Sequence, residues 1–119
     1  PKRINYITLN QWFDKSLLKE NSLHPIFFPS VNKSNYEMFM SDFKYEYGLD
    51  GDQLSFLSYD LIGLVYFLIY ENNFKISKKI FYKKNKFKGK IGIFEINKNT
   101  ITHQLNFYGI KDNNFKKIF

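Results

Sequence analysis

The residue types that most often carry catalysis or bind metals are scarce in this 119-residue sequence. It contains two histidines, His24 and His103, and no cysteine. A structural zinc site takes about four nitrogen or sulfur ligands, and the two histidines have no partners at ligand spacing. No serine, histidine and aspartate arrangement indicates nucleophilic catalysis. We therefore expect a protein that is not an enzyme and that uses no metal and no cofactor.

Four carboxylates gather where one helix is expected to end and the next to begin: Asp42, Glu46, Asp50 and Asp52. A calcium loop needs further oxygen ligands, including the bidentate glutamate that closes such a loop, and these are missing here. We interpret the four acids as turn and helix-capping residues.

Gly89 and Gly92, in "FKGKIGIF", have a spacing that a phosphate-binding loop also uses. Such a loop places the N-terminus of a helix behind its glycines, and no helix is expected after Gly92. We interpret the glycines as positions of close strand packing or of a bulge.

Residues 75–90 hold eight lysines and no acid, and the net charge of the chain is +7. Phe81, Tyr82 and Phe87 lie among the lysines, and aromatic rings can stack on bases while lysines hold phosphates. However, this stretch has no arginine, the usual residue for fork-like phosphate contacts. An abundance of Lys, Asn, Ile, Phe and Tyr is also what an AT-rich genome favours, so the charge alone is a weak signal. We favour a solvated surface, and keep a small basic nucleic-acid-binding module as an alternative.

The elements that position these residues begin with short strands and a helix. Residues 4–9, "INYITL", alternate apolar and polar side chains as a strand does, and residues 24–29, "HPIFFP", predict a second extended piece. Ser34 and Glu37 have the spacing of a capping box. Phe39, Phe43 and Tyr47 then recur at helical spacing before Gly48, a typical left-handed helix stop.

A second helix is predicted over about residues 53–71, with Asp52 as its N-cap. Residues 54–70, "LSFLSYDLIGLVYFLIY", carry a single charge, that of Asp60. This length lies at the lower edge for a membrane span, and a central aspartate is costly in a bilayer. A helix that is apolar on nearly all sides also suits the interior of a larger domain. We expect the buried helix and no membrane span.

The last third predicts strands. Residues 75–84, "KISKKIFYKK", predict a turn or two of amphipathic helix with Ile76, Ile80 and Phe81 inward. Residues 87–110 predict a β-hairpin with its turn at 97–100, and residues 110–118 a last extended piece. A hairpin alone is marginally stable in water and needs other elements to cover it. The element order indicates an α/β fold with helices packed on a sheet, and its strands are too few to cover both helices.

These segments in this order resemble the C-terminal third of a type 1 periplasmic-binding-protein fold. The residues that carry the resemblance are Tyr47-Gly48, Tyr59-Asp60 and Phe87-x-Gly89-x-x-Gly92-x-Phe94, followed by a closing hairpin. Upstream, "LNQWFDKSLLKENSLHPIFFPS" is similar to the strand, tryptophan-containing loop and hinge crossing of that family. The similarity is greatest to bacterial envelope lipoproteins of the penicillin-binding-protein-activator and branched-chain amino-acid-binding kinds, and it spans nearly the whole chain.

The resemblance implies a periplasmic or envelope-associated solute-binding protein in which two lobes close around a small ligand such as an amino acid, for ABC-type transport. Residues 1–119 would form a single C-terminal segment of a larger domain, whose N-terminal part is a missing partner of the same fold. A scaffold that contacts an envelope protein of cell-wall synthesis is the alternative within the family. No signal peptide is evident in the sequence.

The resemblance also implies candidate ligand-binding residues. Ligands of open α/β sheets bind beyond the carboxyl ends of strands, which indicates Asn10, Gln11 and Trp12. Amino-acid binders of this family place an acid there for the ligand's ammonium group, whereas Asn10 and Gln11 are neutral. The family also places an aromatic side chain just before its Tyr-Asp helix motif, and Phe56 is the nearest match. Trp12 and Phe56 as core residues are the competing interpretation.

Overall fold

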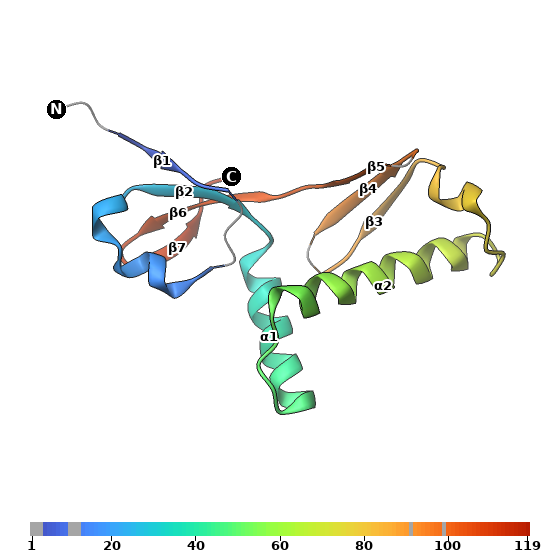
Figure 1. The fold of residues 1–119 in the computed structure, drawn as a ribbon, viewed down its shortest axis with the longest axis horizontal. Coiled ribbons are helices and arrows are strands. Elements are labelled where there is room, and N and C mark those ends of the chain that lie inside the picture. Colours follow the sequence, from blue (N-terminus) through green and yellow to red (C-terminus); the bar gives the residue numbers. More distant parts are fainter. Residues whose placement is uncertain (1–3, 10–12, 91, 99) are drawn as a thin grey trace. The chain divides into compact units, whose positions relative to one another are not determined.

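The structure is a computed structural model that describes residues 4–9, 13–90, 92–98 and 100–119 (Figure 1). It divides into two compact units. We call Pro1–Lys33 together with Leu105–Phe119 the terminal unit, and Ser34–Gln104 the central unit. The chain is mixed α/β, as predicted, with two α-helices and two sheets in its described part.

The described elements, with η for a 3₁₀ helix, are β1 (Tyr6–Ile7), η1 (Lys15–Lys19), η2 (Asn21–Leu23), β2 (Ile26–Ser30), α1 (Lys33–Tyr47), α2 (Gln53–Glu71), η3 (Lys78–Phe81), β3 (Asn85–Lys88), β4 (Ile93–Asn97), β5 (Thr100–His103), β6 (Asn106–Lys111) and β7 (Asn114–Lys117).

The terminal unit is a four-stranded sheet in the order β1-β2-β6-β7. β1 runs parallel to β2, whereas β6 is antiparallel to both β2 and β7. The strand expected over residues 4–9 forms, but only Tyr6–Ile7 pair as strand. The sequence predicts one extended piece over residues 110–118. The structure has instead the end of β6, a turn and β7, which pair as a hairpin. Asp112 and Asn113 turn the chain with φ of 53° and 56°, a conformation that Asp and Asn adopt more readily than most residues.

Aromatic rings fill the core of the terminal unit. β2 alternates strictly, so that Ile26, Phe28 and Ser30 are buried. The Phe28 ring packs against Phe13, Tyr108 and Phe115, with centroids 5.7 to 6.1 Å apart. This packing fixes the register of β2 against β6, because a slip of one residue would move Phe28 to the opposite face.

α1 starts two residues earlier than the capping-box pattern predicts, so Ser34 lies in the first turn of the helix and not at its N-cap. Its end agrees with the sequence: Gly48 has φ of 66° and donates its N–H to the carbonyl of Lys44. α2 has the predicted bounds, and the N-cap Asp52 accepts hydrogen bonds from the N–H and hydroxyl of Ser55, both at 2.7 Å.

In the central unit, α2 runs along the meander β3-β4-β5 (Figure 1). Leu64, Leu68, Ile80 and Ile96 form the buried cluster between them. Of the three apolar residues expected to point inward near η3, only Ile80 does. Ile76, which precedes η3, is 73% exposed, and Phe81, at the end of η3, is 38% exposed.

α2 is buried along one stripe only. Phe56, Asp60, Leu64 and Leu68 are buried at four-residue spacing, while other apolar side chains of the helix are exposed, among them Leu57, Leu61, Ile62, Val65 and Tyr66. By length and composition α2 is also apolar enough to cross a membrane, a property shared by core helices of soluble proteins. The expected burial on all sides is therefore not found among the described residues, where one apolar face of α2 is exposed.

Candidate functional site

The residues predicted to bind a ligand are placed as follows. Asn10, Gln11 and Trp12 lie outside the described residues. Phe56 is 0% exposed, and its ring packs on Tyr36 and Phe39 at centroid distances of 5.4 and 4.9 Å. In this arrangement Phe56 joins α1 to α2 and presents no surface to a ligand. The predicted binding role of these four residues stays a prediction.

Two motifs that are far apart in the sequence meet at Asp60. This carboxylate is 2% exposed, and its Oδ1 accepts a hydrogen bond of 2.8 Å from the backbone N–H of Lys90. A Cβ at Gly89 would collide with the Asp60 carboxylate. Gly89 is thus required for close approach of the chain to α2, and not for a left-handed turn. The Tyr-Asp motif and the glycine motif form one joint, which we call the Asp60 joint.

The turn between β3 and β4 is held to the helices at further points. The N–H of Gly89 donates to the carbonyl of Gly92 at 2.8 Å, closing the turn. The Asn35 side-chain amide on α1 donates to the carbonyl of Lys90 at 2.7 Å. These bonds fix the backbone of Lys90 and so determine where its side chain begins.

His103 on β5 lies near this joint. Its imidazole stacks on Phe94 of β4, with centroids 4.5 Å apart and planes 9° from parallel. The buried Nε2 atom has no hydrogen-bond partner in the described part of the chain. Burial lowers the pKa of His103 below its ordinary value of 6.5, and the negative charge of Asp60 opposes this in part.

A pocket of about 600 Å³ lies between α1 and the first half of α2. Four of its rings form a continuous series from Tyr59 through Phe39 and Phe43 to Tyr47, with successive centroids 5.5, 5.8 and 4.7 Å apart. Phe39 is buried, whereas Tyr47 and Tyr59 are more than half exposed. The rings therefore form one continuous aromatic wall that solvent can reach.

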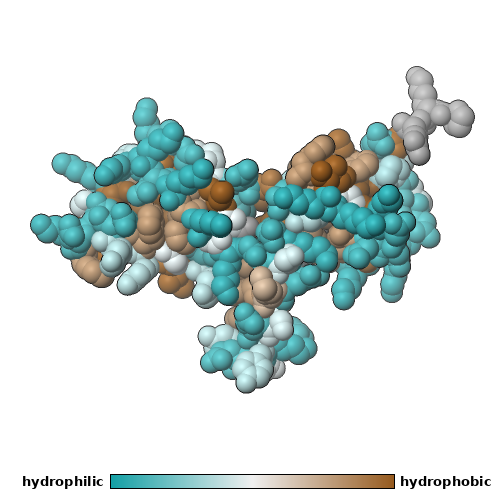
Figure 2. Space-filling view, turned by 180° about the vertical axis from the view of Figure 1, so that it is seen from behind, coloured by the Kyte–Doolittle hydropathy of each residue, from teal (hydrophilic) through white to brown (hydrophobic). Residues whose placement is uncertain are grey.

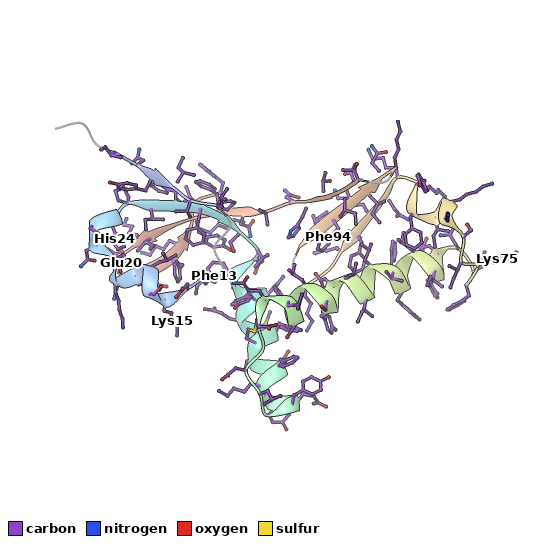
Figure 3. The ribbon with its side chains drawn as sticks, in the orientation of Figure 1. Phe13, Lys15, Glu20, His24, Lys75 and Phe94 are labelled. Carbon is purple, nitrogen blue, oxygen red and sulfur yellow. The ribbon has the colours of Figure 1, made fainter. Side chains whose placement is uncertain are left out.

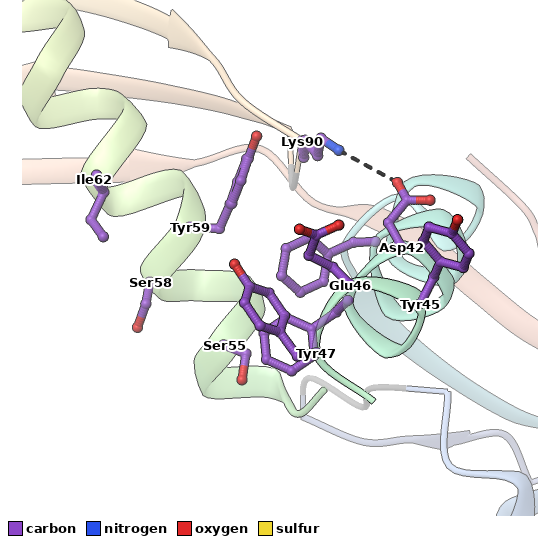
Figure 4. A pocket seen from close by; sticks show the side chains of 11 residues that line it. Asp42, Tyr45, Glu46, Tyr47, Ser55, Ser58, Tyr59, Ile62 and Lys90 are labelled. Carbon is purple, nitrogen blue, oxygen red and sulfur yellow. Dashed lines mark ion pairs between the residues drawn. The ribbon is translucent and has the colours of Figure 1, made fainter. Parts of the chain in front are cut away.

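Charged groups line the same pocket (Figure 4). Lys90 reaches in from the β3–β4 turn, with its Nζ 3.9 Å from Oδ2 of Asp42 and 5.3 Å from the centroid of the Tyr59 ring. Glu46 is one turn beyond Asp42 on α1 and also lines the pocket. No ion pair to Glu46 occurs among the described residues. We call this set of aromatic and charged side chains the aromatic pocket.

His24, the second histidine, belongs to the terminal unit (Figure 3). Its Nε2 lies 3.2 Å from the carbonyl oxygen of Leu17, so it fixes the η1 segment. In the part of the chain that the structure describes, no three His, Cys, Asp or Glu side chains gather closely enough to hold a metal ion.

Most residues of the aromatic pocket belong to patterns evident in the sequence. Phe39, Phe43 and Tyr47 form the helical stripe, and Asp42 and Glu46 are among the acids interpreted as turn residues. The sequence interpretation does not predict that this stripe faces Ser55, Tyr59 and Ile62 on α2, although Tyr59 belongs to the Tyr-Asp motif. Their spacing of three and four residues is that of one helix face, which was the available signal.

Comparison with known proteins yields no family model, no characterised protein sequence and no solved structure that matches this chain.

Proposed function

We propose that this chain is part of a non-enzymatic, two-lobed solute-binding protein of the periplasmic-binding type, in which hinge closure captures a small ligand such as an amino acid. The chain corresponds to the C-terminal portion of such a fold. Its place is the periplasm or cell envelope, and delivery of the solute to an ABC-type transporter follows from that role.

The observation that carries this proposal is the Asp60 joint. The resemblance rests on separate short motifs, and the structure brings two of them into direct contact: Asp60 accepts the N–H of Lys90 and occupies the space beside Gly89. This contact is the structural feature that links two of the motifs on which the proposal rests. The chain path also supports the proposal, because residues 34–104 form one unit between two segments of the other.

The test is a ligand screen on the complete gene product. We expect an amino acid, an organic acid or another small solute to raise the melting temperature and, by hinge closure, to reduce the radius of gyration in solution scattering. Trp12→Ala and Gln11→Ala should abolish the ligand-induced shift while leaving the unliganded melting temperature unchanged. Asn21→Ala, a substitution in η2, serves as the control. If no solute shifts the complete protein, or if Trp12→Ala binds normally, solute capture by these residues is wrong.

A second candidate function is favoured by the uncovered apolar face of α2. This face consists of exposed side chains such as Leu57, Leu61 and Val65, and exposed apolar patches are typical of protein-contact sites. Figure 2 shows one side of the molecule, where apolar areas lie among hydrophilic ones. A scaffold of the cell envelope that binds a protein of cell-wall synthesis would use such a face. If the chain is such a scaffold, Leu61→Glu should abolish protein binding, and solute binding should be unaffected. If the chain is a solute-binding protein, Trp12→Ala should abolish solute binding and Leu61→Glu should have no effect on it.

A small basic nucleic-acid-binding module is the candidate from a different class of protein. All eight lysines of residues 75–90 are exposed, and two of them form ion pairs, Lys84 with Glu95 and Lys90 with Asp42. Binding to an oligonucleotide that weakens steeply with added salt would favour it. Absence of oligonucleotide binding at low salt would exclude the nucleic-acid-binding function.

A further inference from the structure

The aromatic pocket combines two features that usually occur apart. Its wall is a continuous series of four rings, and two carboxylates, Asp42 and Glu46, lie on the same helix as three of these rings. In a chain whose net charge is +7, the pocket lining carries two acids against one base. The local charge is therefore opposite in sign to that of the whole protein.

The side chain of Lys90 shows how a cation is accommodated here. Its ammonium group lies over the face of Tyr59 and beside Asp42. An aromatic face attracts a cation through the negative potential above the ring, and the carboxylate adds a charge of opposite sign. One end of the pocket is thus occupied by a cation of the chain itself.

The lining holds a second acid without a cation beside it in the described residues. Glu46, one helical turn beyond Asp42, lines the pocket together with Tyr47, and the ring of Tyr47 is 4.7 Å from that of Phe43. Glu46 forms no ion pair in the described part of the chain, as noted above. An acid and a pair of rings at the edge of a pocket suit a ligand that is both cationic and apolar.

We propose that the aromatic pocket binds an organic cation of the quaternary-ammonium or alkylammonium class. The alkyl groups of the ligand lie on Phe43 and Tyr47, and its positive charge is balanced by Glu46. Lys90 competes with the ligand for the negative charge of the pocket, because it already neutralises Asp42. This site lies within the central unit and is independent of the solute-capture proposal.

The ligand class follows from what each component recognises. A simple metal cation needs several oxygen ligands around it, whereas this wall is mostly carbon. A neutral apolar molecule would pack against the rings and would gain no electrostatic attraction from Glu46. A methylated ammonium group is weakly hydrated, fits against aromatic faces and carries the charge that the acid requires.

Choline and 3,3-dimethylbutan-1-ol form the matched pair of probes. The two molecules have nearly the same shape, and only choline is charged. Titration of the full chain, followed by the NMR signals of the pocket rings and by calorimetry, should show choline binding more tightly by about fivefold. Equal affinity for the two probes would overturn the proposal, since it would reveal an apolar groove without charge selection. So would choline-induced shifts confined to residues outside the pocket.

Three variants test the assigned roles. Glu46→Gln should weaken choline binding about threefold, and Tyr47→Leu, which keeps an apolar side chain but removes the ring, by a similar factor. Lys90→Gln should strengthen binding about threefold, because it removes the competing cation and leaves Asp42 available.

The control for Lys90→Gln is Lys44→Gln, which makes the same change of charge on a lysine that pairs with Asp50 and does not line the pocket. We expect unchanged affinity. If both lysine variants strengthen binding equally, the effect is one of overall charge and the assigned role of Lys90 is wrong. If Glu46→Gln leaves choline binding unchanged, the site as proposed is wrong.

Discussion

The terminal and central units reach stability by different means. In the terminal unit, buried aromatic rings contact one another on the inner face of a small sheet, with Phe28 at the centre. In the central unit, a buried carboxylate holds a glycine turn against a helix, and that helix has an apolar face that the chain does not cover. The first unit depends on apolar ring contacts, whereas the second combines an apolar cluster with one polar joint whose geometry must be kept.

The difference has a physical basis in strand length. The strands of the terminal unit have two to six residues, so each contributes few backbone hydrogen bonds, and large rings bury the most apolar area per residue. In the central unit α2 spans 19 residues and supplies its own backbone hydrogen bonds. What it needs is attachment to the meander, which the Asp60 joint and the Leu64 to Ile96 cluster provide.

The largest expected effect comes from the centre of the terminal unit. Phe28→Ala should lower the free energy of unfolding by about 4 kcal/mol, because it leaves a cavity among three other rings. Phe27→Ala, in the same strand but on the half-buried face, should cost less. Hydrogen exchange should show lost protection in β2, β6 and β7, with α2 still protected. Equal loss of hydrogen-exchange protection in both units would show that they unfold together. The two units would then not be stabilised independently.

The Asp60 joint is best tested by a double-mutant cycle. Asp60→Ala leaves the N–H of Lys90 without its acceptor, and Gly89→Ala places a methyl group against the carboxylate. Each should destabilise the central unit by about 2 kcal/mol. Together they should cost less than the sum, because removal of the carboxylate makes room for the methyl group. Strict additivity in chemical denaturation would mean that the two residues do not act as one joint.

A smaller effect is expected where α1 begins. The Tyr108 hydroxyl accepts a hydrogen bond of 2.9 Å from the backbone N–H of Lys33, and the Asn106 amide lies 3.4 Å from the same oxygen. Tyr108→Phe removes this acceptor and should cost about 1 kcal/mol in thermal or chemical unfolding. Tyr45→Phe, at a position that is 91% exposed, is the control and should change nothing measurable. A loss equal to that of Phe28→Ala would indicate that the phenyl packing had also changed.

The smallest effect is the pH dependence due to His103. Because burial holds its pKa in the folded protein below 6.5, the unfolded chain binds a proton more readily than the folded chain between these two values. Stability is therefore complete above pH 6.5 and falls as the pH decreases toward the lower, folded-state pKa.

Urea unfolding between pH 5 and 7.5 should show this loss in the natural chain. It should be reduced in His103→Phe, which keeps a ring against Phe94. His24→Gln is the comparison for the terminal unit. If His103→Phe and the natural chain lose stability in parallel, protonation of His103 has no part in it.

Local signals in the sequence were enough for the helices. The Asp52 cap and the glycine stop at Gly48 act over a few residues, so they predict the start of α2 and the end of α1. The predicted start of α1 is wrong by two residues, and there the backbone N–H of Lys33 bonds to Tyr108, an acceptor 75 positions away. Similarly, the β6–β7 turn was missed although Asp112 and Asn113 are typical turn residues.

The sequence by itself determined the α/β class, the bounds of α2, the end of α1, the presence of strands in the last third and the scarcity of catalytic residues. These properties depend on neighbours along the chain. Only the tertiary structure decided that Asp60 meets Gly89 and Lys90, that Phe56 is enclosed by α1, and that rings and acids from two helices share one pocket. Those contacts join residues far apart in the sequence, and their geometry depends on packing that no short stretch of residues specifies.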